Sequence, residues 1–556
     1  MKDEYDVIVV GAGVSGAMIA WKLAESGAKV LILEAGDHRD RRQMVGTFAA
    51  ATNKAPMAPY VDPSRDPHAP FAIDYADKAQ NHYIQSGPSD FKSGYVRLVG
   101  GSTWHFLGNT PRFVPNDFRM KTKYRVGVDW PLSYDNLESW YCEAEREMGV
   151  AADHDEWNNV LGAWRSEPFP MTSIWRAYGD AIVGASLDGQ VFKDVKVSIR
   201  STPQARNSRP YQDRPPCAGN SSCVPICPIE AKYDASVHVR KALGACRPAE
   251  LSERAVVKRL FAHGGGRITH VEYERWEAAK ETRKKMQARA RFYVLAAHAI
   301  ETPLIMLESG LSRSGPVGLN LMDHLQGYGG AIMPQPVFPF RGPPVTSGID
   351  EFRDGDFRTE RAAFRISIGN DGWGRMEALE VTIKKVIFED RLTGKALREA
   401  VNHRATRMLR LSYSTEMLPE RRNRVSVGGY DKYGNPRPKI EFSFPDYNRK
   451  TFEFGNTLFN DFFDRMGVGR GEDERQLQKS DQYSGAGHIM GTCCMGSSKS
   501  DSVVDRNGRA HEHPNLFLAG ASLFPTCGTA NPTLTAAALA LRTASVIRNE
   551  LEARKS

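Results

Sequence analysis

The hydrophobic pattern at the two ends of the chain predicts buried parallel strands. Short apolar runs occur at residues 7–10, 29–33 and 293–297, each leading towards glycine or a helix-compatible stretch. Runs of this length bounded by turn signals are typical of strands inside a doubly wound sheet. Residues 534–551 form an alanine-rich apolar segment, which predicts a long buried helix. We therefore expect an α/β domain assembled from both ends of the chain.

Residues 330–482 show a different pattern, in which apolar and polar residues alternate. RVSV at 424–427 and KIEF at 439–442 are examples, and the segment between them carries Gly429, Gly434, Pro436 and Pro438. Alternation between turn residues is typical of antiparallel strands with one buried face. This part of the chain predicts a second domain built on an antiparallel sheet.

The composition is that of an ordinary globular enzyme. Of 556 residues, 41% are hydrophobic, 25% charged and 10% aromatic, which argues against disorder and fibrous structure. The formal charge of +8 is a mild excess without a clustered basic stripe, so nucleic-acid binding is not expected. No run of eighteen apolar residues occurs. The polar first residues and the glycine motif after them are interpreted as a first strand, not as a signal peptide.

A glycine motif follows the first strand and precedes a helix-compatible run. Gly11, Gly13 and Gly16 complete the pattern G-x-G-x-x-G. The first glycine permits a tight turn, the second lets a pyrophosphate approach the backbone, and the third allows close helix packing. Glu34 ends the second strand, where an acidic side chain accepts hydrogen bonds from an unphosphorylated ribose. Together these elements predict a bound dinucleotide, either FAD or NAD.

Six further segments carry a family resemblance that covers essentially the whole chain. They are VGGSTWH at 99–105, AIETP at 299–303, VGLNLMDH at 317–324, GHIMGT at 487–492, NLFLAG at 515–520 and NPTLT at 531–535. Jointly they resemble the glucose-methanol-choline (GMC) family of FAD oxidoreductases. Within it, they are similar to the branch that contains the flavoprotein subunits of bacterial gluconate, fructose and FAD-dependent glucose dehydrogenases. The resemblance favours FAD over NAD.

The resemblance also implies a two-domain α/β fold of the GMC type. A Rossmann-like FAD-binding domain would be joined to a substrate-binding domain of antiparallel sheet and helices. The FAD-binding domain is expected to comprise residues 1–45, 85–125, 205–330 and 482–556. The substrate-binding domain is expected to comprise residues 126–204 and 331–481.

Residues expected to contact FAD lie in several separate segments. Gly100 and Gly101 permit the backbone to pass close to a flat ring, and Ser102 and Thr103 offer hydroxyls to phosphate or flavin edges. The resemblance implies further contacts from Val257, Gly520, Ala521, Pro532 and Thr533. His105 lies four residues after Gly101, the spacing at which similar pyranose oxidases carry a histidine bonded to the flavin 8α-methyl group. A covalent flavin bond and a histidine that only forms hydrogen bonds both remain open.

His488 and Asn531 match the catalytic positions of the family. Oxidation of an alcohol by hydride transfer needs a base for the hydroxyl proton, and histidine suits this role because its ordinary pKa lies near 6.5. The resemblance implies that His488 is this base and that Asn531 orients the substrate hydroxyl. Sugar dehydrogenases of this branch commonly carry asparagine before the histidine, whereas Gly487 stands here. This departure leaves the particular sugar open.

Three of the eight cysteines cluster in a loop at residues 211–230. Cys217, Cys223 and Cys227 form C-x5-C-x3-C-P, and a bacterial ferredoxin run laid over them puts Asn220 where its second cysteine would stand. Three thiolates predict a 3Fe-4S cluster, which the resemblance also implies. Cys246 offers a fourth ligand for a four-iron site, zinc fits the x5 spacing poorly, and a metal-free structural loop is the main alternative. The remaining cysteines are interpreted as packed small residues, namely Cys142, Cys493, Cys494 and Cys527.

These observations lead to one functional hypothesis and its competitors. The chain is expected to be an FAD-dependent dehydrogenase that oxidises an alcohol carbon of a sugar or sugar acid, with gluconate at carbon 2 first and aldoses or fructose close behind. The resemblance implies two partners, a small subunit with a twin-arginine (Tat) export signal and a membrane-bound multihaem cytochrome c. It also implies a periplasmic location at the inner membrane, with a cytoplasmic location as the alternative. A flavin-containing lyase, an electron-transfer subunit and an oxygen-using oxidase are the competing functions.

Overall fold

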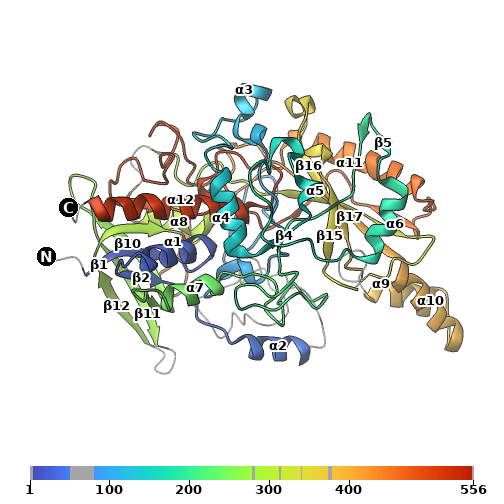
Figure 1. Ribbon diagram of the computed structural model, residues 1–556, viewed down its shortest axis with the longest axis horizontal. Helices are drawn as coiled ribbons and strands as arrows, with labels where there is room; N and C mark the ends of the chain where they lie inside the picture. The colour runs from blue at the N-terminus through green and yellow to red at the C-terminus, as the bar shows by residue number, and fades with distance from the viewer. Residues whose placement is uncertain are drawn as a thin grey trace.

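Two β-sheets with helices packed on them occupy opposite ends of the molecule (Figure 1). A computed structural model describes residues 4–50, 81–277, 282–311, 315–339, 341–372 and 379–553. Both termini lie at the same end, beside the sheet that contains the first strand (Figure 1). The other sheet is built from the middle of the chain, so the connecting segments cross between the two.

The five-stranded sheet near the termini is parallel throughout. Its strands run in the order β22 (Leu516–Leu518), β13 (Ala290–Leu295), β1 (Tyr5–Val10), β2 (Val30–Leu33) and β9 (Glu250–Ser252). The apolar runs of β1 and β2 are buried on both faces, as expected for central parallel strands. The predicted strands at residues 7–10 and 29–33 are confirmed. The third begins and ends earlier than predicted, because Ala296 and Ala297 form the turn against Gly11.

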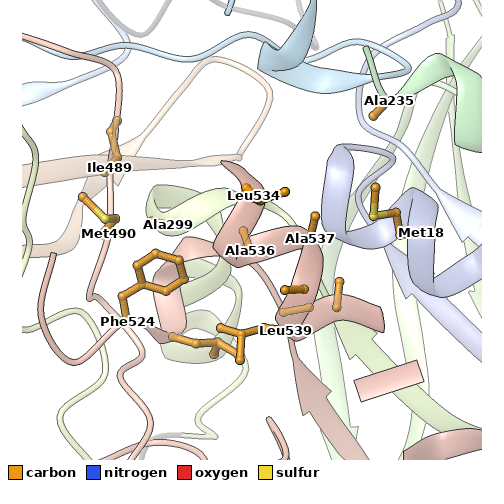
Figure 2. Packing of buried hydrophobic residues seen from close by; sticks show 14 of the residues in the cluster. Met18, Ala235, Ala299, Ile489, Met490, Phe524, Leu534, Ala536, Ala537 and Leu539 are labelled. Carbon is orange, nitrogen blue, oxygen red and sulfur yellow. The ribbon is translucent and has the colours of Figure 1, made fainter. Parts of the chain in front are cut away.

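Three helices cover one side of this sheet. α1 (Val14–Glu25) packs against both α7 (Ser236–Leu243) and α12 (Pro532–Ala553). Figure 2 shows Ala537 of α12 on the side of that helix that faces Met18 of α1, with Phe524 on the other side. The small alanine side chains allow the helices to approach closely. The long C-terminal helix predicted from its composition is confirmed. Its first turn begins at Pro532, directly after the predicted site residue Asn531.

An antiparallel sheet and a further helix complete this end of the molecule. The sheet consists of β10 (Ala255–Ala262), β11 (Ile268–Glu277) and β12 (Thr282–Ala288). α8 (His298–Glu308) packs against β10. Val257 lies in β10, which brings this strand to the predicted nucleotide site.

The sheet at the other end has seven strands and is antiparallel. Its strands run in the order β20 (Arg475–Leu477), β14 (Leu325–Ile332), β17 (Met408–Thr415), β16 (Phe364–Gly369), β15 (Val345–Ile349) and β7 (Arg200–Ser201), and β21 (Ser484–Gly485) pairs with β14. One face carries Ile366, Leu411 and Tyr413, which are buried. They lie in one hydrophobic core with Phe452 and Phe459 of α11 (Asp446–Arg465). The predicted antiparallel sheet is confirmed.

The alternating segments at residues 424–427 and 439–442 belong to a different sheet. β18 (Arg424–Tyr430) and β19 (Pro436–Glu441) pair with each other, and β19 also pairs with β3 (Ile84–Ser86). Both strands pack against α8, a helix of the nucleotide-binding end. Residues 331–481 therefore supply strands to both ends of the molecule, and the predicted domain boundaries stay a prediction.

Shorter elements connect these layers. They are α2 (Arg41–Ala50), α3 (Met120–Tyr124), α4 (Glu138–Met148), β4 (Val150–Ala151), α5 (His154–Trp157), α6 (Tyr178–Leu187), β5 (Val191–Phe192), β6 (Val195–Lys196), β8 (Gln204–Ala205), α9 (Leu379–Ile383) and α10 (Gly394–Arg407). In the described parts of the chain, no helix is both long and apolar enough to cross a membrane.

Candidate functional site

A cavity of about 460 Å³ lies between the nucleotide-binding end and the polar face of the seven-stranded sheet. Most of the predicted cofactor and catalytic residues line it: Gly11, Gly13, Glu34, Gly101, Ser102, Thr103, His105, Val257, His488, Gly520, Ala521, Asn531, Pro532 and Thr533. Gly16 and Gly100 do not line the cavity, because both lie behind its wall. Positions far apart in the sequence thus converge on one space.

The first glycine turn is shaped to receive a dinucleotide. Gly11 has a φ of +100°, and a Cβ atom there would lie 2.5 Å from the carbonyl oxygen of Ala296. A Cβ atom at Gly16 would lie 2.0 Å from the carbonyl oxygen of Gly11, whereas one at Gly13 would meet no protein atom within 4 Å. Gly11 and Gly16 are therefore required by the fold, and Gly13 leaves open space at the N-terminus of α1, where phosphate is favoured.

Glu34 holds the same turn. Its Oε2 accepts a hydrogen bond from the backbone N–H of Ala12 at 2.7 Å, and its Oε1 accepts one from Gly36 at 2.8 Å. Burial raises the pKa of the carboxyl group despite these two bonds. Because each carboxylate oxygen can accept more than one hydrogen bond, Glu34 remains able to bind a ribose hydroxyl from the cavity wall.

The second glycine turn contacts the first one. Gly101 has a φ of +58°, and a Cβ atom there would lie 3.1 Å from Cα of Gly13. Thr103 donates a hydrogen bond to the carbonyl of Gly100 at 2.5 Å and accepts one from the backbone of Ala235 at 2.9 Å. Its hydroxyl thus ties the turn to α7, a role that the sequence reasoning did not foresee. The two turns together fit the phosphates of FAD.

His105 lines the cavity close to a buried lysine. Lys232 donates hydrogen bonds through Nζ to the carbonyls of Thr103, Trp104 and Phe106. Burial and the nearby charge of Lys232 lower the pKa of His105 to about 3. The imidazole of His105 is therefore neutral at physiological pH, and the structure does not decide between a covalent flavin bond and hydrogen bonding at this residue.

The predicted catalytic residues are in direct contact. Nδ2 of Asn531 lies 3.1 Å from Nε2 of His488. Burial, with a further contribution from His324, lowers the pKa of His488 well below its ordinary value, so its imidazole is neutral near pH 7. A neutral imidazole beside an amide, in the wall of a cavity, is suited to take a proton from a bound hydroxyl.

The residue before His488 adopts a left-handed backbone conformation. Gly487 has a φ of +72°, a region that glycine adopts freely and asparagine tolerates better than most residues. Either residue is therefore compatible with the turn that presents His488. The departure from the expected asparagine removes a side chain but not the loop geometry.

Two adjacent residues that were not singled out as site residues support His488 from behind. Asp323 accepts a hydrogen bond from the backbone N–H of His488 at 2.8 Å through Oδ1, and its Oδ2 accepts one from the hydroxyl of Ser93. His324 lies with Nδ1 at 2.8 Å from Nδ1 of His488. Both residues end the segment VGLNLMDH, so the signal was present in the sequence, but only as part of a family motif.

The opposite wall of the cavity is a polar face of the seven-stranded sheet. It carries Gln326 of β14, Arg365 and Ser367 of β16, and Arg410, Ser412 and Ser414 of β17. Gln326 donates a hydrogen bond to Ser414 at 3.0 Å, and the strand register places Arg365 opposite Ser414. The first row of this wall is therefore Gln326, Ser414 and Arg365. Gln326 of this row follows His324 by two residues, which corresponds to roughly 7 Å along the strand.

The two arginines of this wall are held by carboxylates. Arg365 donates to Asp350 at 3.0 Å, to Ser367 at 3.2 Å and to Thr202 at 2.9 Å. Arg410 forms two hydrogen bonds with Asp371. A guanidinium group has five N–H donors. Among the described residues, the remaining N–H groups of Arg365 have no hydrogen-bond partner, so this rigid side chain can also donate to a ligand.

The three clustered cysteines share one loop and are surrounded by hydrogen-bond donors. Sγ of Cys217 accepts from the backbone of Gly219 at 3.4 Å, Sγ of Cys223 from Arg206 at 3.3 Å, and Sγ of Cys227 from the backbone of Lys232 at 3.5 Å. However, across the described ranges no group of three or more His, Cys, Asp or Glu side chains is arranged to hold a metal ion. The iron-sulfur cluster therefore stays a prediction.

Comparison with known proteins identifies the family of this chain. The GMC oxidoreductase models match residues 196–326 and 419–540, and an FAD-dependent oxidoreductase model matches residues 6–63. The chain is 35% identical to the fructose dehydrogenase large subunit of Gluconobacter japonicus over 98% of both chains. It is 24% identical to the gluconate 2-dehydrogenase flavoprotein of Pantoea cypripedii over 98% of this chain and 94% of that one.

A solved structure agrees on the fold. The pyridoxine 4-oxidase from Mesorbium loti superposes with a TM-score of 0.65 at 17% identity, over 98% of this chain and 99% of that one. Identity this low supports the fold alone. The family models, the full-length relative and the two glycine turns facing one cavity lead to a single conclusion: this chain belongs to the GMC family of FAD-dependent oxidoreductases.

Proposed function

We propose that this enzyme is a dehydrogenase that oxidises an alcohol carbon of a sugar or sugar acid, with gluconate at carbon 2 as the first candidate. Glucose and fructose are the alternatives. One observation carries the proposal: the same cavity joins the dinucleotide turns, the His488 and Asn531 pair, and a polar sheet face. The names of the relatives, fructose dehydrogenase and gluconate 2-dehydrogenase, support this substrate class.

The contacts of the site residues support the following roles. FAD, when bound along the two glycine turns, supplies the acceptor for the hydride from the carbinol carbon. His488 takes the hydroxyl proton at Nε2, and Asn531 fixes the position of the hydroxyl through its amide. The proton and the hydride together account for the two hydrogens that leave the alcohol, and a carbonyl remains.

The polar sheet face supports a substrate with many hydroxyl groups. Gln326, Ser414 and Arg365 form the row nearest the histidines, and side chains of this kind donate to and accept from vicinal hydroxyls. Arg365 also suits a carboxylate next to the oxidised carbon, as in gluconate. A simple apolar alcohol would leave the remaining N–H groups of the buried Arg365 side chain without a partner, which costs binding free energy.

We further propose that electrons leave through a 3Fe-4S cluster bound by Cys217, Cys223 and Cys227. The three sulfur atoms accept hydrogen bonds from the surrounding loop, and hydrogen bonds to sulfur are among the factors that set cluster potentials. Cys246 is exposed and donates to Glu25, which argues against a fourth ligand from that residue. The proposed acceptor is a membrane-bound multihaem cytochrome c, and a small subunit with a Tat signal would carry the complex to the periplasm.

The flavin is proposed to be held covalently or by hydrogen bonds at His105. The position of His105 in the cavity wall and its neutral imidazole are compatible with a covalent bond and with hydrogen bonds. Denaturation in acid decides between them, since a covalently bound flavin stays with the precipitated protein and a dissociable one enters the supernatant.

The function is tested by an anaerobic visible spectrum of the purified protein before and after addition of gluconate, glucose and fructose. Bleaching of the flavin absorbance by one of them is expected and identifies the substrate. Absence of bleaching with all three would contradict the proposed substrate class, and would favour a lyase or an electron-transfer subunit. Iron and sulfide are assayed on the same sample, and about three irons per chain are expected.

A further inference from the structure

His324 connects the side chain of His488 to a backbone carbonyl. It is fully buried, and its Nδ1 lies 2.8 Å from Nδ1 of His488. On the other side of the ring, its Nε2 lies 3.0 Å from the carbonyl oxygen of Gly528 and 3.3 Å from that of Cys527. The two imidazoles are nearly perpendicular, with an interplanar angle of 87°.

The protons in this chain follow from elementary hydrogen-bond chemistry. A carbonyl oxygen only accepts hydrogen bonds, so Nε2 of His324 must carry a proton. Burial lowers the pKa of His324 to about 4, so the ring is neutral and its second nitrogen has a lone pair. Nδ1 of His324 can then only accept, and Nδ1 of His488 must be the donor. Since His488 is also neutral, its Nε2 is left with a lone pair.

We infer that His324 is a positioning residue that holds His488 in the tautomer with its lone pair on Nε2, the atom facing the cavity. The opposite tautomer would set two Nδ1 lone pairs against each other at 2.8 Å and would present an N–H to the substrate. The same order of protons requires the amide nitrogen of Asn531 to face Nε2 of His488, which matches the 3.1 Å contact. The base role of His488 rests on the proposed function, whereas its tautomer does not.

The surroundings of the pair are mixed in charge. Glu416 raises the pKa of His324 and Arg353 lowers it, while burial outweighs both. Asp323 hydrogen-bonds the backbone of His488. When His488 gains a proton at Nε2, its Nδ1–H still donates to a neutral acceptor, so the chain of hydrogen bonds persists through proton transfer. Hydrogen bonds to a charged donor are the stronger kind.

The tautomer is measured directly by nitrogen-15 NMR of the FAD-loaded protein with labelled histidine, at pH 7.5 and without substrate. The signals of His488 are assigned by comparison with His488→Gln. The inference expects a protonated Nδ1 and an unprotonated Nε2. A protonated Nε2 would overturn it, whatever alcohol the enzyme oxidises.

Three variants test the consequence for catalysis. His324→Leu removes the acceptor, and anaerobic flavin reduction is expected to slow on the order of 100-fold at pH 7. His324→Asn can place a carbonyl oxygen near the former Nδ1 and is expected to recover part of the rate. The matched control is His238→Leu, since His238 is another fully buried histidine whose pKa is lowered to about 4. It hydrogen-bonds Tyr233 and Glu147 away from His488, so the reduction rate should be unchanged.

The pH profile separates tautomer control from a structural role. In His324→Leu the rate should rise steadily with pH, because solvent hydroxide can replace a base of the wrong tautomer. A loss that is equal at every pH, or a reduction rate equal to that of the wild type, would overturn the inference. The NMR result on the wild-type protein decides the question if His324→Leu does not fold.

Discussion

The carboxylate of Asp323 accepts a hydrogen bond from the backbone N–H of His488 at 2.8 Å and is itself buried. Ser93 bonds the other oxygen of this carboxylate and accepts from the backbone of Gly487 at 2.8 Å. The loop that presents His488 is therefore anchored by its backbone, while the histidine side chain lies in the cavity wall between His324 and Asn531.

This anchor predicts a dependence of stability on pH. Burial raises the pKa of Asp323 to about 6, so the folded protein binds this proton more tightly than the unfolded chain does. The stabilisation from Asp323 is complete below about pH 4 and is lost as the pH rises through 6, by about 1.4 kcal/mol per pH unit in that window. Urea unfolding at pH 4.5, 5.5 and 6.5 should show that Asp323→Asn lacks this component. If the free energy of unfolding changes equally with pH in the wild type and in Asp323→Asn, the assignment of this pH dependence to Asp323 is contradicted.

Substitution of two glycines should separate cofactor binding from folding. A Cβ atom at Gly13 meets no protein atom within 4 Å, whereas one at Gly16 lies 2.0 Å from the carbonyl of Gly11. Gly13→Ala is expected to fold normally and to lose FAD affinity by about tenfold or more, because the methyl group enters the space for the pyrophosphate. Gly16→Ala is expected to lower the melting temperature of the apoprotein. Flavin content measures the loss of FAD, and thermal melts measure the loss of stability. Full FAD retention in Gly13→Ala would contradict the assignment of this space to the pyrophosphate.

The polar sheet face should govern substrate affinity. Gln326→Leu removes the hydrogen bond to Ser414 and one polar group of the first row. We expect KM for the sugar to rise about tenfold or more, because the substrate hydroxyl loses its partner, with flavin content unchanged. Ser426→Ala in β18 lies outside the cavity lining and is the control. Equal KM values for Gln326→Leu and the wild type would remove this face from the substrate site.

The cysteine loop predicts which cysteines the protein needs to retain its iron. Cys223→Ala and Cys227→Ala should each lose most of the iron, since three thiolates leave no spare ligand. Cys246→Ala should retain it, because Cys246 is exposed and bonded to Glu25. Iron and sulfide assays on proteins purified without oxygen measure this. Equal iron in all four proteins, or none in the wild type, would exclude the cluster.

Much of the nucleotide-binding end could be predicted because its signals are local. The apolar runs of β1 and β2 are continuous, and Gly11, Gly13 and Gly16 stand between a strand and a helix, so both the elements and the turn follow from short stretches. The alanine-rich helix α12 is likewise a single segment. These features depend little on what the rest of the chain does.

The supports of the site could not be predicted in the same way. His324 and His488 lie 164 residues apart, so their contact exists only in the folded protein. Gln326 and Arg365 are polar residues in alternating strands, a pattern that equally describes a face exposed to solvent. Thr103 lines the cavity as predicted, and the sequence did not indicate that its hydroxyl also bonds Gly100 and Ala235. In each case the tertiary fold decides which polar group faces the cavity.

The central claim is that His488 takes the proton from a sugar hydroxyl while the flavin is reduced. The most direct measurement is the rate of anaerobic flavin reduction in wild type and in His488→Gln, with the sugar that bleaches the wild-type flavin. The account predicts a rate lower by on the order of 10²- to 10⁴-fold in the variant, with its FAD retained. A variant that reduces its flavin within about threefold of the wild-type rate, against that expectation of general base catalysis, would contradict the account.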